Sequence, residues 1–287
     1  MKSLFKIIHE VRHADWPFII QSFFFYLLFL IAGAYLIENS EIIILYAIGL
    51  TSFFLLTTLF HVYRILKKEF GFLQYKIQAL QEIYHLLSIR SPLPSMTSWA
   101  ATPELAIKVI ELIQTHKPNI IVELGSGITT LLSGYALERF HPDGKLISID
   151  HDPIYTEKTL NKIHHHKLEK FIELRNAPLT KTELNGKRWN WYNTDQLHFD
   201  KTIDLVIVDG PPVKTQKDAR YPALPLLFNH LSQSSVIIIH DTHRDAESRI
   251  VDSWLENFPV FEKEPFSTEK GITILYKNSS LTKKSKI

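Results

Sequence analysis

The amino-acid sequence of 287 residues contains no cysteine, which excludes disulfide bonds, thiolate metal sites and cysteine nucleophiles. An excess of either charge is also missing, because the formal net charge is only +2. So small a net charge gives no electrostatic reason to expect nucleic acid as a partner. A chain of this length has room for one domain of about 180 to 200 residues and an additional segment.

Charged residues are absent from two long stretches near the N-terminus. These are Trp16 to Ile37, with 22 residues, and Ile42 to Phe60, with 19 residues. At 1.5 Å per helical residue the first stretch spans about 33 Å, which matches the hydrocarbon core of a bilayer. A signal peptide is the alternative, but the first stretch is too long, starts too late and is followed directly by the second. We therefore predict a transmembrane helical hairpin with spans at about 16–37 and 42–60.

Basic residues flank both outer ends of this predicted hairpin, whereas its connecting loop is acidic. The basic residues are Lys2, Lys6, Arg12, Arg64, Lys67 and Lys68, and the loop carries Glu38 and Glu41. Because basic residues favour the cytoplasmic side, both termini and the globular domain that follows are predicted to be cytoplasmic. The sequence thus predicts a multi-pass membrane protein with two spans and the lipid bilayer as a partner.

A heptad stripe of apolar residues follows the second span. Its members are Leu66, Phe70, Leu73, Ile77, Leu80, Tyr84 and Leu87. The alternating spacing of four and three predicts a long amphipathic helix that extends the second span. The stripe fits either a homodimer formed through residues 66–87 or packing against the chain's own globular domain. We predict a hairpin segment at 1–61, the heptad helix and linker at 62–94, a globular domain at 95–277 and a polar, basic tail at 278–287.

Residues 120–137, IIVELGSGITTLLSGYAL, predict a buried parallel strand, a tight turn and a helix. Gly125 and Gly127 let a ligand approach the backbone closely at a helix N-terminus, which is typical of a nucleotide site. A dinucleotide fingerprint would need a third glycine where Thr130 stands, and Glu123 would place negative charge beside a pyrophosphate. A ligand with an ammonium group and no phosphate, such as S-adenosylmethionine, suits this turn better.

Strands and helices alternate after this turn, which predicts a doubly wound parallel sheet. The later strands are expected at 145–150, 171–175, 204–208, 235–239, 259–266 and 271–277. Helices are expected at about 102–114, 128–137, 153–163, 219–231 and 245–257. Polar residues follow or end the strands and are expected around one shared cavity: Glu123, Asp150, Asn176, Asp209 and Asp241.

The runs ELGSGITT, ISIDHDP, RNAPL and IDLVIVDGPP, with two closing strands, resemble the class I S-adenosylmethionine-dependent methyltransferases. The resemblance covers about residues 95–277 and implies a Rossmann-like α/β fold with a seven-stranded, mostly parallel sheet. In that family the matching residues hold the methionine moiety, the ribose and the adenine of the cofactor. The implied cofactor-binding residues are Glu123, Gly125, Ser126, Gly127, Thr129, Asp150, His151, Asn176, Ala177 and Asp209.

Metal binding is left open by a departure from the catechol-type branch of this family. That branch holds magnesium with an acid after the fourth strand and an Asp-Asn pair after the fifth. Asp209 and Asp241 match the two acids, but Thr242 replaces the asparagine. A divalent cation such as Mg²⁺ at Asp209 and Asp241 is therefore an open possibility.

Methyl transfer from a sulfonium is an in-line displacement, so the protein must align donor and acceptor and take up the acceptor's proton. Asp209 is the first candidate for this catalytic role, followed by Asp241 and His240. Arg220 is a candidate for binding an anionic acceptor, and an ion pair at a helix start is the alternative for this residue.

A long loop is expected at residues 178–201, with aromatic residues that suit a lid or an acceptor wall. Trp191 and Tyr192 are its candidate acceptor-binding residues, and Trp99 is expected to close the other side. The alternative is that these rings cover the edge of the sheet.

The leading hypothesis is a membrane-anchored methyltransferase that methylates a hydroxyl group of a small-molecule, sugar or lipid-linked acceptor at the cytoplasmic face. One alternative is a non-catalytic membrane scaffold that retains the fold. Another is a nicotinamide-dependent oxidoreductase, which Glu123 and Thr130 disfavour.

Overall fold

The computed structural model describes residues 16–36, 40–96 and 100–278. The chain divides into two compact units, Met1–Leu73 and Gln74–Ile287. The division falls inside one long helix, α3 (Ser40–Leu86).

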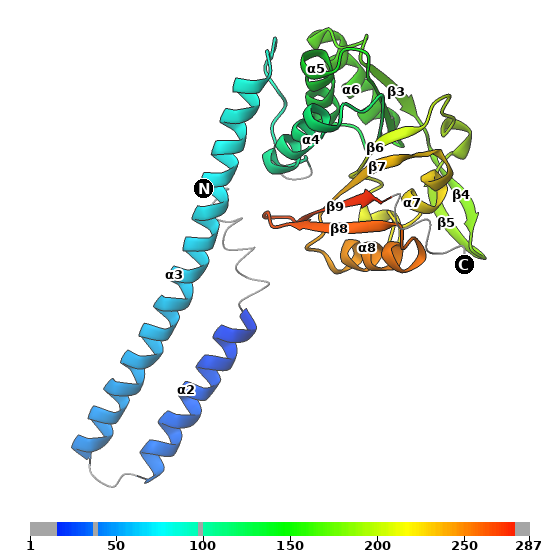
Figure 1. Cartoon of the computed structure of the whole chain (residues 1–287). Coiled ribbons are helices and arrows are strands. Elements are labelled where there is room, and N and C mark those ends of the chain that lie inside the picture. The colour runs from blue at the N-terminus through cyan, green and yellow to red at the C-terminus, as the bar shows by residue number, and fades with distance from the viewer. Residues whose placement is uncertain (1–15, 37–39, 97–99, 279–287) are drawn as a thin grey trace. The chain divides into compact units, whose positions relative to one another are not determined.

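The first unit is a helical hairpin. Helix α2 (Trp16–Leu36) lies beside the first part of α3 (Ser40–Leu86) in Figure 1. The Tyr46 hydroxyl donates a hydrogen bond to the carbonyl of Phe29 at 3.0 Å. Gly33 is required at this crossing, because a Cβ there would collide with the ring of Tyr46.

One helix among the described residues is long and apolar enough to cross a membrane, over Glu41–Leu86. None of its most apolar window is buried, which is not the pattern of a core helix in a soluble protein. The apolar helix at Ile20–Tyr35 is shorter. One candidate span is thus present, and the second span and the cytoplasmic orientation stay predictions.

The end of α3, from Gln74 to Leu86, belongs to the second unit and packs partly into the core of that unit. Ala79 and Ile83 are buried in the core of that unit, whereas Ile77 and Tyr84 of the stripe are 49% and 55% exposed. Leu87 of the stripe is buried in the same core and Leu80 is half-buried, so the stripe is only partly exposed. Packing on the chain's own domain and the homodimer therefore both stay predictions.

The second unit contains a seven-stranded sheet in the order β3-β2-β1-β6-β7-β9-β8. The strands are β1 (Ile120–Leu124), β2 (Lys145–Asp150), β3 (Ile172–Asn176), β6 (Ile203–Val208), β7 (Leu231–His240), β8 (Phe261–Phe266) and β9 (Ile272–Lys277). The first five strands of this order are parallel, and β9 pairs antiparallel with both β7 and β8. The predicted fold class, a seven-stranded, mostly parallel Rossmann-like sheet, is confirmed.

Helices cover both faces of the sheet (Figure 1). They are α4 (Pro103–His116), α5 (Ile128–Phe140), α6 (Pro153–His166), α7 (Ala223–Leu227) and α8 (Asp245–Asn257), with 3-10 turns at Thr194–Gln196, Val213–Thr215 and Phe228–His230. Alternate side chains of the strands belong to two separate apolar cores. Ile121, for example, lies in the first core and Val122 in the second. The first core packs against α4 and α5, and the second against α7 and α8.

Two predicted elements were wrong. The expected loop at 178–201 contains an antiparallel hairpin of β4 (Leu179–Leu184) and β5 (Lys187–Tyr192). Asn185 and Gly186 join these strands with positive φ angles of 52° and 71°, the Asn-Gly turn typical of a two-residue hairpin. The helix expected at 219–231 is reduced to α7, because prolines precede and interrupt it.

Candidate active site

The glycine turn after β1 is held between the ends of β2 and β6. Gly125 has a φ of 95°, and a Cβ there would lie 3.1 Å from the backbone nitrogen of Gly210. Ser126 donates from its backbone N–H and from its hydroxyl to Oδ2 of Asp150, both at 2.8 Å. Gly127 is the N-cap residue of α5, and its N–H donates to the Thr130 hydroxyl at 2.9 Å. The turn therefore needs glycine at its first position and is tied to Asp150.

The Glu123 carboxylate is fully buried and accepts hydrogen bonds from three hydroxyls. Thr129 donates to Oε1 at 2.5 Å, while Thr130 and Ser148 donate to Oε2 at 2.5 and 2.6 Å. Burial raises the pKa of Glu123 to about 7, although these hydroxyls partly offset it. The hydrogen bond between Thr129 and Glu123 thus links β1 to the first turn of α5. Contact of these two residues with a cofactor stays a prediction.

Asp150 ends β2 and is nearly buried. Its Oδ1 accepts from the Asp152 N–H at 3.0 Å, and Nδ1 of His151 lies 3.4 Å from the same oxygen. Burial alone would raise the pKa of Asp150, but the hydrogen bonds from His151, Asp152 and Ser126 bring it below its ordinary value. Asp150 is therefore ionised at neutral pH.

Asn176 lies beside Asp150, because the two residues are partners in the β2–β3 register. Its side-chain amide donates to the Thr156 hydroxyl at 3.1 Å, and the N–H of Ala177 donates to the carbonyl of Asp150 at 2.7 Å. Asp150, which the family resemblance assigns to the ribose, is thus adjacent to Asn176 and Ala177, which it assigns to the adenine.

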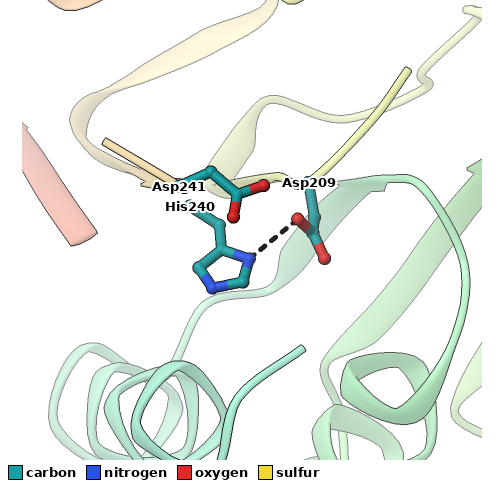
Figure 2. A group of neighbouring side chains, drawn as sticks. All are labelled: Asp209, His240 and Asp241. Carbon is teal, nitrogen blue, oxygen red and sulfur yellow. Dashed lines mark hydrogen bonds and ion pairs between the residues drawn. The ribbon is translucent and has the colours of Figure 1, made fainter. Parts of the chain in front are cut away.

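Asp209 follows β6 and forms a polar cluster with residues at the end of β7 (Figure 2). Nδ1 of His240 lies 2.9 Å from Oδ1 of Asp209, and Asp241 directs its carboxylate into the same space. Burial would raise the pKa of Asp209, but His240, Arg220 and Lys270 lower it below its ordinary value. The three predicted catalytic residues are therefore brought together.

Arg220 does not reach an acceptor site. It is 3% exposed, and it donates to the carbonyls of His240 and Asp209 at 2.9 and 2.8 Å. It also lies 3.1 Å from Oδ2 of Asp241. The predicted role in binding an anionic acceptor is thus corrected: the guanidinium is committed to the protein's own acids and carbonyls.

Tyr192 lies where the ends of these strands meet. A Cβ on Gly210 would collide with its hydroxyl, which has no hydrogen-bond partner among the described residues. The His151 ring packs edge-on against the Tyr192 ring, with ring centroids 6.2 Å apart. Burial raises the pKa of Tyr192 well above 10, and Asp150, Asp209 and Glu123 raise it further. The three predicted acids therefore act on one buried hydroxyl.

Trp191 is buried in the second apolar core, so the alternative that the rings cover the sheet describes it better than an acceptor wall. Trp99 lies outside the described residues. Sequence reasoning missed Ser148, Arg244 and Lys270 as parts of the site. For Ser148 a signal existed, because the parallel register pairs it with Glu123.

Residues 122–242 match the family model described as a methyltransferase domain. The chain carries a methyltransferase domain. The predicted enzyme class is thereby confirmed, while the acceptor and the membrane setting are not part of this match. A search of the curated proteins found no match.

Solved structures share the fold of the methyltransferase domain at low identity. The cofactor-bound protein Rv0187 from MTB is 14% identical, with 72% of this chain and 89% of that chain covered and a TM-score of 0.50. An O-methyltransferase from Bacillus cereus in complex with SAH is 15% identical, with coverages of 70% and 89% and a TM-score of 0.48. TomG from Streptomyces achromogenes, an O-methyltransferase in complex with SAM, is 14% identical, with coverages of 63% and 82% and a TM-score of 0.46. The likeness to Rv0187 supports the fold.

Proposed function

We propose that the methyltransferase domain uses S-adenosylmethionine to methylate a hydroxyl group of a small molecule, a sugar or a lipid-linked acceptor. The observation that carries this proposal is the geometry of the glycine turn. Ser126 links the turn to Asp150 by two hydrogen bonds, and Gly125 lies close against the backbone of Gly210. A ligand on this turn can meet the carboxyl ends of β1, β2 and β6 at once. Open parallel sheets bind nucleotide-like ligands at such an edge.

The residues around the turn fit the parts of this cofactor. No atom of the described residues lies within 4 Å of a Cβ built on Gly127, so there is open space at the N-terminus of α5. Backbone amides at such a terminus suit the methionine carboxylate. Asp150 would hold the ribose hydroxyls, and Asn176 with Ala177 would border the adenine. Glu123 would support this set by holding the turn.

Bound S-adenosylmethionine supplies a sulfonium-linked methyl group that an oxygen nucleophile can displace. Asp209 is the proposed base, since His240 and Arg220 hold its Oδ1 and no described residue donates to its Oδ2. Its lowered pKa keeps the carboxylate ionised, so Oδ2 can orient an acceptor hydroxyl and accept its proton. His240 would stabilise the carboxylate through Nδ1, and Asp241 would complete the cluster through Arg220.

We also propose that α3, with α2 as a second span, anchors the domain at the cytoplasmic face of a membrane. The exposed apolar window within Glu41–Leu86 supports this proposal, as do the basic residues on both outer sides of the hairpin. An anchor of this kind would hold the site near lipid headgroups, which favours the lipid-linked class of acceptor.

Mass spectrometry of membrane and metabolite extracts from cells with wild-type chain or Asp209→Ala tests the function. The variant is expected to accumulate a species that is lighter by one CH₂ unit. Asp252→Ala, at an exposed position of α8, is the matched control and should give the wild-type profile. Identical profiles for wild type and Asp209→Ala would instead support the non-catalytic scaffold.

A further inference from the structure

Three possible metal ligands lie together at the carboxyl ends of β6 and β7. Asp209, His240 and Asp241 each offer one ligand atom, and these atoms lie within 4.8 Å of one another (Figure 2). Carboxylate oxygens are the ligands that Mg²⁺ prefers. The cluster would suit a divalent ion only if its negative charge were not already neutralised.

A guanidinium already lies against both acids. Nη2 of Arg220 is 3.1 Å from Oδ2 of Asp241 and 3.4 Å from Oδ1 of Asp209. The two hydrogen bonds from Arg220 to the carbonyls of His240 and Asp209 hold the group in place. Because these carbonyls are backbone groups at the ends of two neighbouring strands, the guanidinium cannot leave without unpairing them.

A second guanidinium and a third acid belong to the same cluster. Nη1 of Arg244 lies 2.8 Å from Oδ2 of Asp241, and Oε1 of Glu247 lies 3.8 Å from Nε of Arg220 and 4.0 Å from Nη1 of Arg244. Nδ1 of His240 already faces Oδ1 of Asp209 at 2.9 Å, so only its Nε2 is left for another partner. Because Arg220 lies against both acids and is held there by two backbone carbonyls, the residues present do not fit a divalent cation.

We propose that Arg220 takes the place of the divalent ion of the metal-dependent branch, so that the methyl transfer requires no divalent metal. This inference rests on the proposed function of the domain. Arg220 is a positioning residue, because it acts through Asp209 and Asp241. Thr242, in place of the metal-binding asparagine, agrees with this assignment.

Titration of the full-length wild-type chain with Mn²⁺, followed by electron paramagnetic resonance of the free ion, tests the proposal directly. The expected result is no stoichiometric binding of Mn²⁺, together with methyl transfer that persists in the presence of EDTA. One tightly bound Mn²⁺ per chain, or loss of activity in EDTA that added Mg²⁺ restores, would overturn the proposal.

Two variants separate the charge of Arg220 from its packing. Arg220→Met removes the charge, so Mn²⁺ affinity is expected to rise at least about tenfold as the two acids lose their shared partner. Arg220→Lys keeps the charge and is expected to exclude Mn²⁺ like the wild type, with reduced activity because the fork geometry is lost. Equal Mn²⁺ affinity for Arg220→Met and the wild type would count against the assignment. If Arg220→Met does not fold, the wild-type titration and Arg220→Lys still decide, because stoichiometric Mn²⁺ binding by either refutes the proposal.

Mn²⁺ binding and cofactor binding are separate measurements on the same chain. Mn²⁺ binding is measured without acceptor or cofactor, so it is informative whether or not methyl transfer is found. A chain that does not bind S-adenosylhomocysteine refutes the proposed function, whereas a chain that binds both S-adenosylhomocysteine and stoichiometric Mn²⁺ refutes only the role of Arg220.

Discussion

Ser126 donates two hydrogen bonds to one carboxylate oxygen of Asp150, from its N–H and its hydroxyl, both at 2.8 Å. The acid that would meet the ribose therefore also holds the turn that would meet the methionine moiety. These hydrogen bonds fix the position of the turn relative to the Asp150 carboxylate.

Asp150→Asn is expected to weaken binding of S-adenosylhomocysteine by about 10- to 100-fold, since charge-assisted hydrogen bonds contribute about 1.5–3 kcal/mol. The folded pKa of Asp150 is lowered, so its contribution to stability is present above its unfolded pKa and is lost as pH falls through the folded pKa. Calorimetric titration and urea unfolding at several pH values measure the two effects.

Asp195→Asn, at an exposed carboxylate in a 3-10 turn, is the control and should change neither quantity. An Asp150→Asn variant with wild-type affinity would contradict the role of this carboxylate.

Glu123→Gln tests the buried carboxyl group. Because burial raises the folded pKa of Glu123 from 4.5 to about 7, its contribution is full below pH 4.5 and is lost as pH rises through about 7. At 1.36 kcal/mol per pKa unit the wild type should lose about 3 kcal/mol across this window, and the variant should lose less. The measurement is the free energy of unfolding at pH 4.5 and pH 8.

Glu256→Gln, on the exposed face of α8, should keep the wild-type pH dependence. If the free energy of unfolding of Glu123→Gln changed with pH as much as that of the wild type, the raised pKa of Glu123 would be wrong.

Gly125→Ala should destabilise the domain by about 1–3 kcal/mol, the cost of a non-glycine residue in such a conformation. The added Cβ would also lie 3.1 Å from the backbone nitrogen of Gly210. Gly71→Ala in α3 is the matched control, because its Cβ would meet no described atom within 4 Å and alanine favours a helix. Thermal unfolding of both variants compares the positions, and equal melting temperatures would refute the strain at Gly125.

Tyr192→Phe removes a buried hydroxyl that has no partner among the described residues. The free protein is expected to keep or gain stability, since an unsatisfied polar group costs about 1–3 kcal/mol. If the hydroxyl meets the cofactor, affinity for S-adenosylhomocysteine should fall in the same variant. The melting temperature measures the change in stability, and calorimetric titration measures the change in affinity for S-adenosylhomocysteine.

Tyr135→Phe provides the contrast. The Tyr135 hydroxyl accepts from the Arg90 N–H at 3.0 Å and lies 2.8 Å from Nδ1 of His166. Its removal should lower stability by about 1 kcal/mol and leave affinity unchanged. A stability loss in both variants would show that Tyr192 has a structural partner.

Local sequence signals predicted most of the sheet and the glycine turn. The apolar run before Gly125 and the acids after the strands are properties of neighbouring residues, so they can be recognised without coordinates. The Asn-Gly pair at 185–186 was equally local, and the hairpin it forms could have been predicted from it.

Side-chain partners from distant parts of the chain could not be predicted. Arg220 meets Asp209 and Asp241 only because β6 and β7 are neighbours in the folded sheet. Near the end of α3 the heptad stripe was visible, yet Ala79 and Ile83, which lie outside the stripe, are buried in the core together with Leu87 of the stripe. The pattern identifies an apolar face, whereas the shape of the domain decides which face is buried.

The most direct test of the account is a calorimetric titration of the purified full-length chain with S-adenosylmethionine, S-adenosylhomocysteine and NAD. We expect one binding site per chain for the first two ligands and none for NAD. Absence of binding to both S-adenosyl compounds, or tight binding of NAD alone, would contradict it.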